Sequence, residues 1–192
     1  MSRVKLESKA YDYDRFTGRR LITLLAVFLI YTIWFTSVGP FGQLTQLEGY
    51  SYLQGRGFYS GSEAVAAAES LSAEGRAIKF KALGFDLIYM VLQTWVFEAV
   101  ILFGLAALGL MSSRWRWLLI LPIGFLLFDF LEDSFLALVL LTSSEMIGGF
   151  AGLFTLMKFV FFIPLIVLSL ALGIAGTVAI VLRNRKSSNG EG

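Results

Sequence analysis

Three acidic residues lie close together in a stretch of this chain that is otherwise apolar. Asp129, Glu132 and Asp133 fall within residues 122–141, and their i, i+3 and i+4 spacing places them on one face of a helix. An ionised carboxylate at the centre of a bilayer costs roughly 2.5–3.5 kcal/mol on insertion scales. Three of them therefore need protein, water, a cation or a bound molecule to face. Buried carboxyls that exchange protons serve in general acid–base chemistry and in proton relays.

Charged residues also lie in the two neighbouring apolar segments. Asp86 and Glu98 precede the three acids, and Lys158 follows them. With antiparallel helices that rise about 1.5 Å per residue, Lys158 is expected to meet Asp133 and Glu132 in the outer half of the membrane, with Asp86 above them. Glu98 is expected to meet Asp129 nearer the middle. The sequence thus predicts one polar column built from three helices.

The charge of this predicted column needs compensation. Five acids and one base give a net charge of −4 when all are ionised, which a low-dielectric interior does not tolerate alone. Arg76, Lys79 and Lys81 at the outer mouth offset part of it. Protons, a bound cation, or a cationic or hydrogen-bonding ligand must offset the rest. The alternative for each residue is a structural role, in which buried charges hold helices together.

The composition is that of a membrane protein. Hydrophobic residues make up 57% of the 192 residues, against roughly 45–50% in a typical soluble domain, and the mean hydropathy is +0.74. The chain has no cysteine and no histidine, which excludes disulfide redox chemistry, His-ligated haem and His-ligated metal sites. No metal site is predicted. The net charge of +2 does not indicate a nucleic-acid partner.

Four apolar segments approach or exceed the about 20 residues that a helix needs to cross a bilayer. We expect transmembrane helices at about residues 21–38, 84–111, 117–141 and 153–182. The whole chain, residues 1–192, is expected to form a single integral membrane domain. Its predicted fold class is all-α, a polytopic four-helix bundle.

The distribution of lysine and arginine predicts the orientation. Basic residues gather in the tails 1–20 and 183–192 and in the loop 112–116, whereas the loop 142–152 has none. The positive-inside rule therefore places both termini in the cytoplasm, with the protein in the cell (inner) membrane. Residues 39–83 form the outer loop. The first segment contains aromatic residues and no clear A-x-A site, so it is expected to be an uncleaved anchor.

The outer loop contains a predicted short amphipathic helix. Ser60 and Glu63 have the spacing of a capping box, and the helix is expected to run through residues 64–73 and to end at Gly75. Loops of this length often serve as functional lids, although passive connectors are as common.

Two strings resemble motifs of a family of uncharacterised bacterial four-helix membrane proteins. EGRAIKF at residues 74–80, followed by Asp86 and Tyr89, is similar to a Gly-Arg-x-x-Tyr motif that leads into a helix with Asp and Tyr-Pro. DFLED at residues 129–133 is similar to an Asp-x-x-Glu-Asn motif. The resemblance covers about residues 50–140 and implies a four-helix membrane protein without an established activity. It singles out Arg76, Asp86, Asp129 and Glu132.

Three functions fit these features. The first is a pocket that binds, and in one version transforms, a lipid-like or other small apolar molecule. Asp129 and Glu132 are its candidate acid/base groups, and its candidate ligand-binding residues are Arg76, Asp86, Glu98, Asp133 and Lys158. In this hypothesis Lys158 orients Asp133, and Arg76 gates the mouth or holds a head group. The second function is proton- or cation-coupled transport by a homo-oligomer. The third is a non-enzymatic assembly subunit that pairs its charges with a membrane partner.

Overall fold

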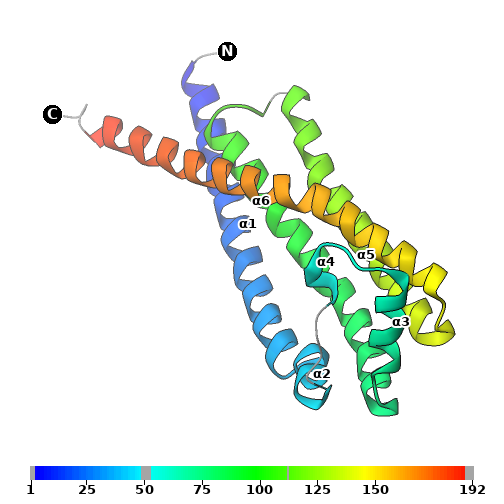
Figure 1. The fold of residues 1–192 in the computed structure, drawn as a ribbon. Coiled ribbons are helices and arrows are strands. Elements are labelled where there is room, and N and C mark those ends of the chain that lie inside the picture. The colour runs from blue at the N-terminus through cyan, green and yellow to red at the C-terminus, as the bar shows by residue number, and fades with distance from the viewer. Residues whose placement is uncertain (1–2, 49–52, 112, 189–192) are drawn as a thin grey trace.

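A computed structural model describes residues 3–48, 53–111 and 113–188 (Figure 1). All described elements are helices, which confirms the predicted all-α class. In chain order they are α1 (Arg3–Ser37), α2 (Pro40–Glu48), η1 (Leu53–Arg56), α3 (Gly61–Glu69), α4 (Ala73–Ala107), η2 (Ser113–Leu119), α5 (Ile120–Thr142) and α6 (Glu145–Ser188).

Three described segments are long and apolar enough to cross a membrane, as expected of a polytopic membrane protein. They are Gly18–Leu47, Ala73–Ala107 and Glu145–Arg185. The helix α5 is 23 residues long and strongly apolar apart from its three acids, all of which are buried.

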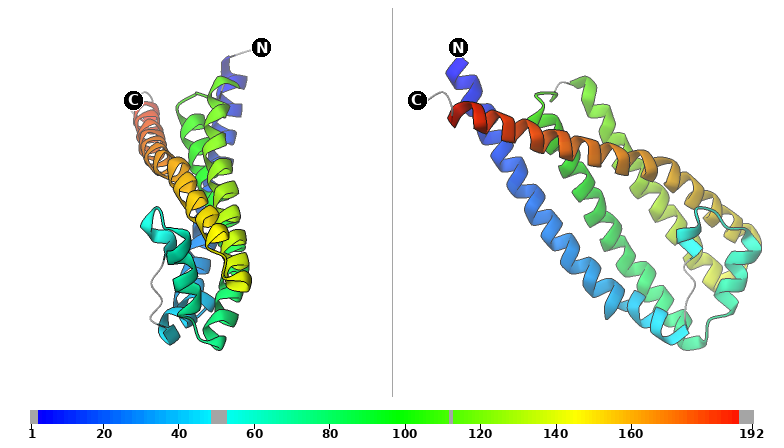
Figure 2. Two further views of the ribbon diagram at one scale, coloured as in Figure 1. Left: turned by 45° about the vertical axis from the view of Figure 1, so that its right-hand side comes forward. Right: turned by 60° about the vertical axis from the view of Figure 1, so that its left-hand side comes forward.

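The long helices form two layers. α1, α4 and α5 lie side by side with α4 in the middle, while α6 and α3 pack on one face of this layer (Figure 2). The N-terminal part of α6 packs against α5 and α3, and the C-terminal part of α6 crosses over α4. Within the described residues, α1 packs mainly on α4 and α2. The arrangement is therefore more open than a closed four-helix bundle, because none of the described helices lies over one face of α4.

The helices extend beyond the predicted apolar segments. α4 begins at Ala73, where the side chain of Ser72 accepts a hydrogen bond from the amide of Gly75. Gly75 therefore lies in the first turn of α4. The prediction that Gly75 ends the preceding helix is wrong. Hydropathy marks where a chain becomes apolar, whereas N-caps decide where a helix begins.

The predicted capping box at α3 is confirmed. The hydroxyl of Ser60 accepts from the amide of Glu63, and the carboxylate of Glu63 accepts from the amide of Ser60. The helix ends at Glu69, earlier than predicted, and Ser70 forms its C-cap.

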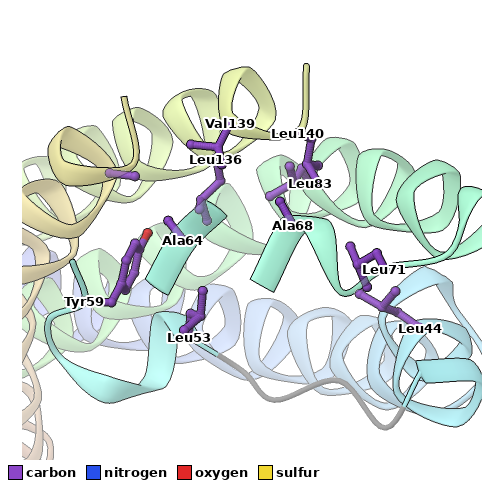
Figure 3. Packing of buried hydrophobic residues seen from close by; sticks show 11 residues of the cluster. Leu44, Leu53, Tyr59, Ala64, Ala68, Leu71, Leu83, Leu136, Val139 and Leu140 are labelled. Carbon is purple, nitrogen blue, oxygen red and sulfur yellow. The ribbon is translucent and has the colours of Figure 1, made fainter. Parts of the chain in front are cut away.

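Small residues let α3 approach α6 closely. A Cβ atom on Gly148 would lie 2.8 Å from the carbonyl oxygen of Gly61, and one on Gly152 would overlap the carbonyl oxygen of Tyr59. Gly148 and Gly152 belong to α6, although the sequence placed them in a loop. Around this contact, Tyr59, Ala64 and Ala68 pack against Leu136 and Val139 of α5 (Figure 3). The segment 53–71 is thereby held against the helices that carry the acids.

Candidate functional site

Lys158 is the centre of a buried ion-pair cluster. Its Nζ lies 3.0 Å from Oδ1 of Asp129 and makes a second, shorter contact with Oε2 of Glu132. Asp129 and Glu132 are three residues apart on α5, so both face Lys158 on the adjacent α6. Glu132 is fully buried. The prediction that Lys158 meets Glu132 is confirmed, whereas its second partner is Asp129 and not the expected Asp133.

A pair of carboxyl groups extends the cluster toward the start of α4. The carboxyl groups of Asp86 and Asp133 lie within hydrogen-bonding reach of each other. Two carboxyl groups hydrogen-bond only when one of them carries a proton, because an ionised carboxylate has no donor. The buried ammonium group of Lys79 interacts electrostatically with both carboxyls. Lys79 is therefore part of the cluster, although the sequence had placed it at the outer mouth.

Tyr59 joins the cluster from outside the long helices. Its hydroxyl donates a hydrogen bond of 3.3 Å to Oε1 of Glu132, and its side chain is fully buried. The side chain of Thr155 on α6 lies beside both Tyr59 and Glu132, and its hydroxyl donates to the carbonyl oxygen of Ala151. Sequence reasoning missed Tyr59 because it lies in the loop 39–83, and only the glycine contacts with α6 bring it to the acids.

Glu98 does not belong to the cluster. It makes no hydrogen bond or ion pair in the part of the chain that the structure describes, and it is only partly buried. Asp86 and Glu98 are 12 residues apart on α4, which at 3.6 residues per turn places them about 120° apart around the helix. The predicted pairing of Glu98 with Asp129 is therefore wrong.

Arg76 also lies apart from the acids. Its Nη1 donates a hydrogen bond of 3.2 Å to the carbonyl oxygen of Leu140. This carbonyl is among the last four of α5, which have no partner within the helix. Arg183 does the same for Ala107 at the end of α4, at 2.6 Å. In this conformation Arg76 therefore fixes the end of α5.

The cluster contains more acid than base. It comprises two lysines, Lys79 and Lys158, and four acids: Asp86, Asp129, Glu132 and Asp133. Full ionisation would leave a net charge of −2, and one proton shared by Asp86 and Asp133 would reduce it to −1. Within the described ranges, no three acidic side chains are arranged as for a metal ion. A cavity of about 10 Å³ beside Lys79 has room for about one water molecule.

This arrangement suits the uptake and release of a proton. The carboxyls, lysines and Tyr59 are all hydrogen-bonding groups in a largely buried site, where adding or removing one proton changes the balance of charge substantially. Comparison with family models, curated proteins and solved structures finds no match to this chain.

Proposed function

We propose that the chain is the proton-binding subunit of a proton-coupled membrane transport system. In this proposal α1, α4, α5 and α6 all span the membrane, with both termini in the cytoplasm. The buried cluster around Lys158 and the Asp86–Asp133 pair takes up and releases one proton.

The properties of α5 support its assignment as a fourth span. Its 23 residues correspond to about 35 Å at 1.5 Å per residue, enough for a hydrocarbon core of about 30 Å. Its acids face the protein interior. Apart from Thr142 at its end, the exposed residues of α5 are apolar: Ile120, Ile123, Leu127, Phe130, Leu138 and Leu141. Buried acids and an apolar outer face are what a spanning helix with a functional interior requires.

The carboxyl pair formed by Asp86 and Asp133 is the observation that carries the proposal. Such a pair holds a proton at equilibrium and can release it when the surrounding charge changes. Lys158 balances the charges of the adjacent Asp129 and Glu132. Lys79 and the carboxyl pair thus lie close to the group formed by Lys158, Glu132 and Tyr59.

The closed packing of the site favours a proton over a lipid-like ligand. Glu132 and Tyr59 are fully buried, and the cavity beside Lys79 has room for no more than about one water molecule. A lipid-like molecule would need the segment 53–71 to move away from α5 and α6. A proton needs no such space.

Infrared spectroscopy of the protein in liposomes tests this proposal directly. A protonated carboxyl buried in the protein gives a carbonyl band that an ionised carboxylate lacks. We expect this band in the wild-type protein at neutral pH, and we expect Asp133→Asn to remove it. A folded wild-type protein without the band at neutral pH would contradict the proposal.

A flux assay then tests coupling. Wild-type protein in liposomes with an internal pH-sensitive dye should carry protons down an imposed gradient. Asp86→Asn and Asp133→Asn should reduce the flux. The exposed Glu69 provides the control Glu69→Gln, which should leave the flux unchanged. Flux that persists in both Asn variants would rule out transport through the carboxyl pair.

A further inference from the structure

One face of α4 is not covered by any described helix. α1 and α5 flank α4, and α6 crosses its other face (Figure 2). The residues on the uncovered face follow alternating spacings of four and three, and we call them the α4 seam: Gly84, Ile88, Val91, Trp95, Glu98 and Leu102. This is the spacing with which one helix packs along another in a coiled coil.

The α4 seam is open along its length. Ile88 is 46% exposed and Trp95 is 47% exposed. A Cβ atom on Gly84 would have no neighbour within 4 Å. Small residues of this kind let a second helix approach closely in a membrane. Trp95 lies far from both ends of α4, away from the interfacial depth where tryptophan is most often exposed to lipid.

Exposing this face to lipid costs free energy because it carries the carboxyl group of Glu98. It lies nine residues from the end of α4 at Ala107, about 13 Å along the helix, well inside the apolar part. It has no hydrogen bond or ion pair with the residues described. A carboxyl group at this depth needs a hydrogen-bond donor or a positive charge.

Within the part of the chain that the structure describes, no basic side chain pairs with Glu98. Lys158 is occupied by Asp129 and Glu132, and it is buried between α5 and α6. Lys79 is buried beside the carboxyl pair. A second copy of the chain would have the same buried lysines, and its exposed Arg19 and Arg20 lie at the end of the first span, not at the depth of Glu98. A partner that neutralises Glu98 must therefore bring its own base.

We propose that the α4 seam docks a transmembrane helix of another protein that carries a lysine or arginine at the depth of Glu98. The base pairs with Glu98, and the helix covers Trp95 and Ile88. This inference depends on α4 spanning the membrane and is independent of proton transfer at the buried cluster.

Energy transfer between the protein and a synthetic helix tests this inference. The probe is a leucine-rich transmembrane peptide with one central lysine, and the matched peptide has leucine in its place. Because the chain has no cysteine, Glu69→Cys at an exposed site provides a single label. In liposomes we expect the lysine peptide to associate about tenfold more tightly than the leucine peptide.

Three variants make the test decisive. Glu98→Gln should abolish the preference for lysine, and Ile88→Trp should weaken both peptides by obstructing the seam. Glu145→Gln, which changes an exposed carboxyl in the first turn of α6, should change neither result. Equal binding of the two peptides to the wild type, or a preference that survives in Glu98→Gln, would overturn the proposal. So would efficient cross-linking between two copies through Trp95→Cys, since a second copy would then cover the seam.

Discussion

The hydroxyl of Tyr59 donates a hydrogen bond of 3.3 Å to Glu132, a residue 73 positions later in the chain. Both side chains are fully buried. The bond therefore ties the segment 53–71 to the charged interior of the helices. A change of charge at Glu132 would act directly on Tyr59, and movement of the segment would leave the carboxyl of Glu132 with one partner fewer.

Tyr59→Phe should loosen this segment without unfolding the helices. The substitution keeps the ring and removes the hydrogen bond to Glu132, so we expect a loss of about 0.5–1.5 kcal/mol. Hydrogen–deuterium exchange should show faster exchange at residues 53–59. Exchange in α5 should change little. Unchanged protection of residues 53–59 would mean that ring packing alone holds the segment.

Lys158→Met should destabilise the protein strongly. It leaves Asp129 and Glu132 buried without their positive partner, and breaking a buried ion pair in this way costs about 3–5 kcal/mol. Thermal unfolding in detergent should show a clearly lower midpoint. The same change at the exposed Lys81 should have little effect.

Combined substitutions separate charge from packing in this cluster. Adding Asp129→Asn and Glu132→Gln to Lys158→Met removes the uncompensated charge, so we expect most of the lost stability to return. If the triple variant is no more stable than Lys158→Met, Lys158 would stabilise the protein mainly through the packing of its aliphatic stem and not through its charge.

Two neighbouring glycines of α6 should respond in opposite directions to alanine. A Cβ atom on Gly152 would overlap the carbonyl oxygen of Tyr59, whereas one on Gly149 would meet nothing within 4 Å. Gly152→Ala should therefore push the segment 53–71 away from α6 and cost about 1–3 kcal/mol. Gly149→Ala should stabilise the helix by up to about 1 kcal/mol. Thermal unfolding of the two variants measures both effects, and equal shifts would argue against the close contact.

The sequence predicted those features that follow from local patterns. Helical periodicity brought Asp129 and Glu132 to one face, and depth along the apolar segments brought Lys158 near them. The capping box at Ser60 followed from four consecutive residues. Each of these features depends on spacing within one helix or on the length of a span, which a sequence displays directly.

The sequence did not predict how side chains are distributed around each helix. Depth alone placed Glu98 with Asp129, but the rotation of α4 turns Glu98 away from the acids. Tyr59 and Lys79 join the cluster because of tertiary contacts: glycines of α6 admit the segment before α3, and α4 begins early enough to bury Lys79. Such contacts depend on the packing of several helices, and no single segment encodes them.

The capping box of α3 should make this helix sensitive to acid. The backbone amide of Ser60 donates a hydrogen bond to the carboxylate of Glu63, and the hydroxyl of Ser60 donates a second one. These two bonds, together with the nearby positive charge of Arg56, hold the pKa of Glu63 below its ordinary value of 4.5. A folded-state pKa below the unfolded value means that the box stabilises α3 at neutral pH. This stabilisation is lost as the pH falls through the folded value.

Exchange of the α3 amides, corrected for the intrinsic effect of pH, should therefore accelerate on acidification well below pH 4.5. Glu63→Gln keeps an oxygen that accepts from Ser60 but does not titrate, so it should remove most of this acceleration. Ser60→Ala should raise exchange at all pH values, because losing an N-cap costs about 1 kcal/mol. Glu69→Gln at the other end of α3 should behave like the wild type. If Glu63→Gln shows the same acid response as the wild type, protonation at another site must loosen α3. The buried carboxyl of Glu132, which accepts a hydrogen bond from Tyr59, would be the first to test.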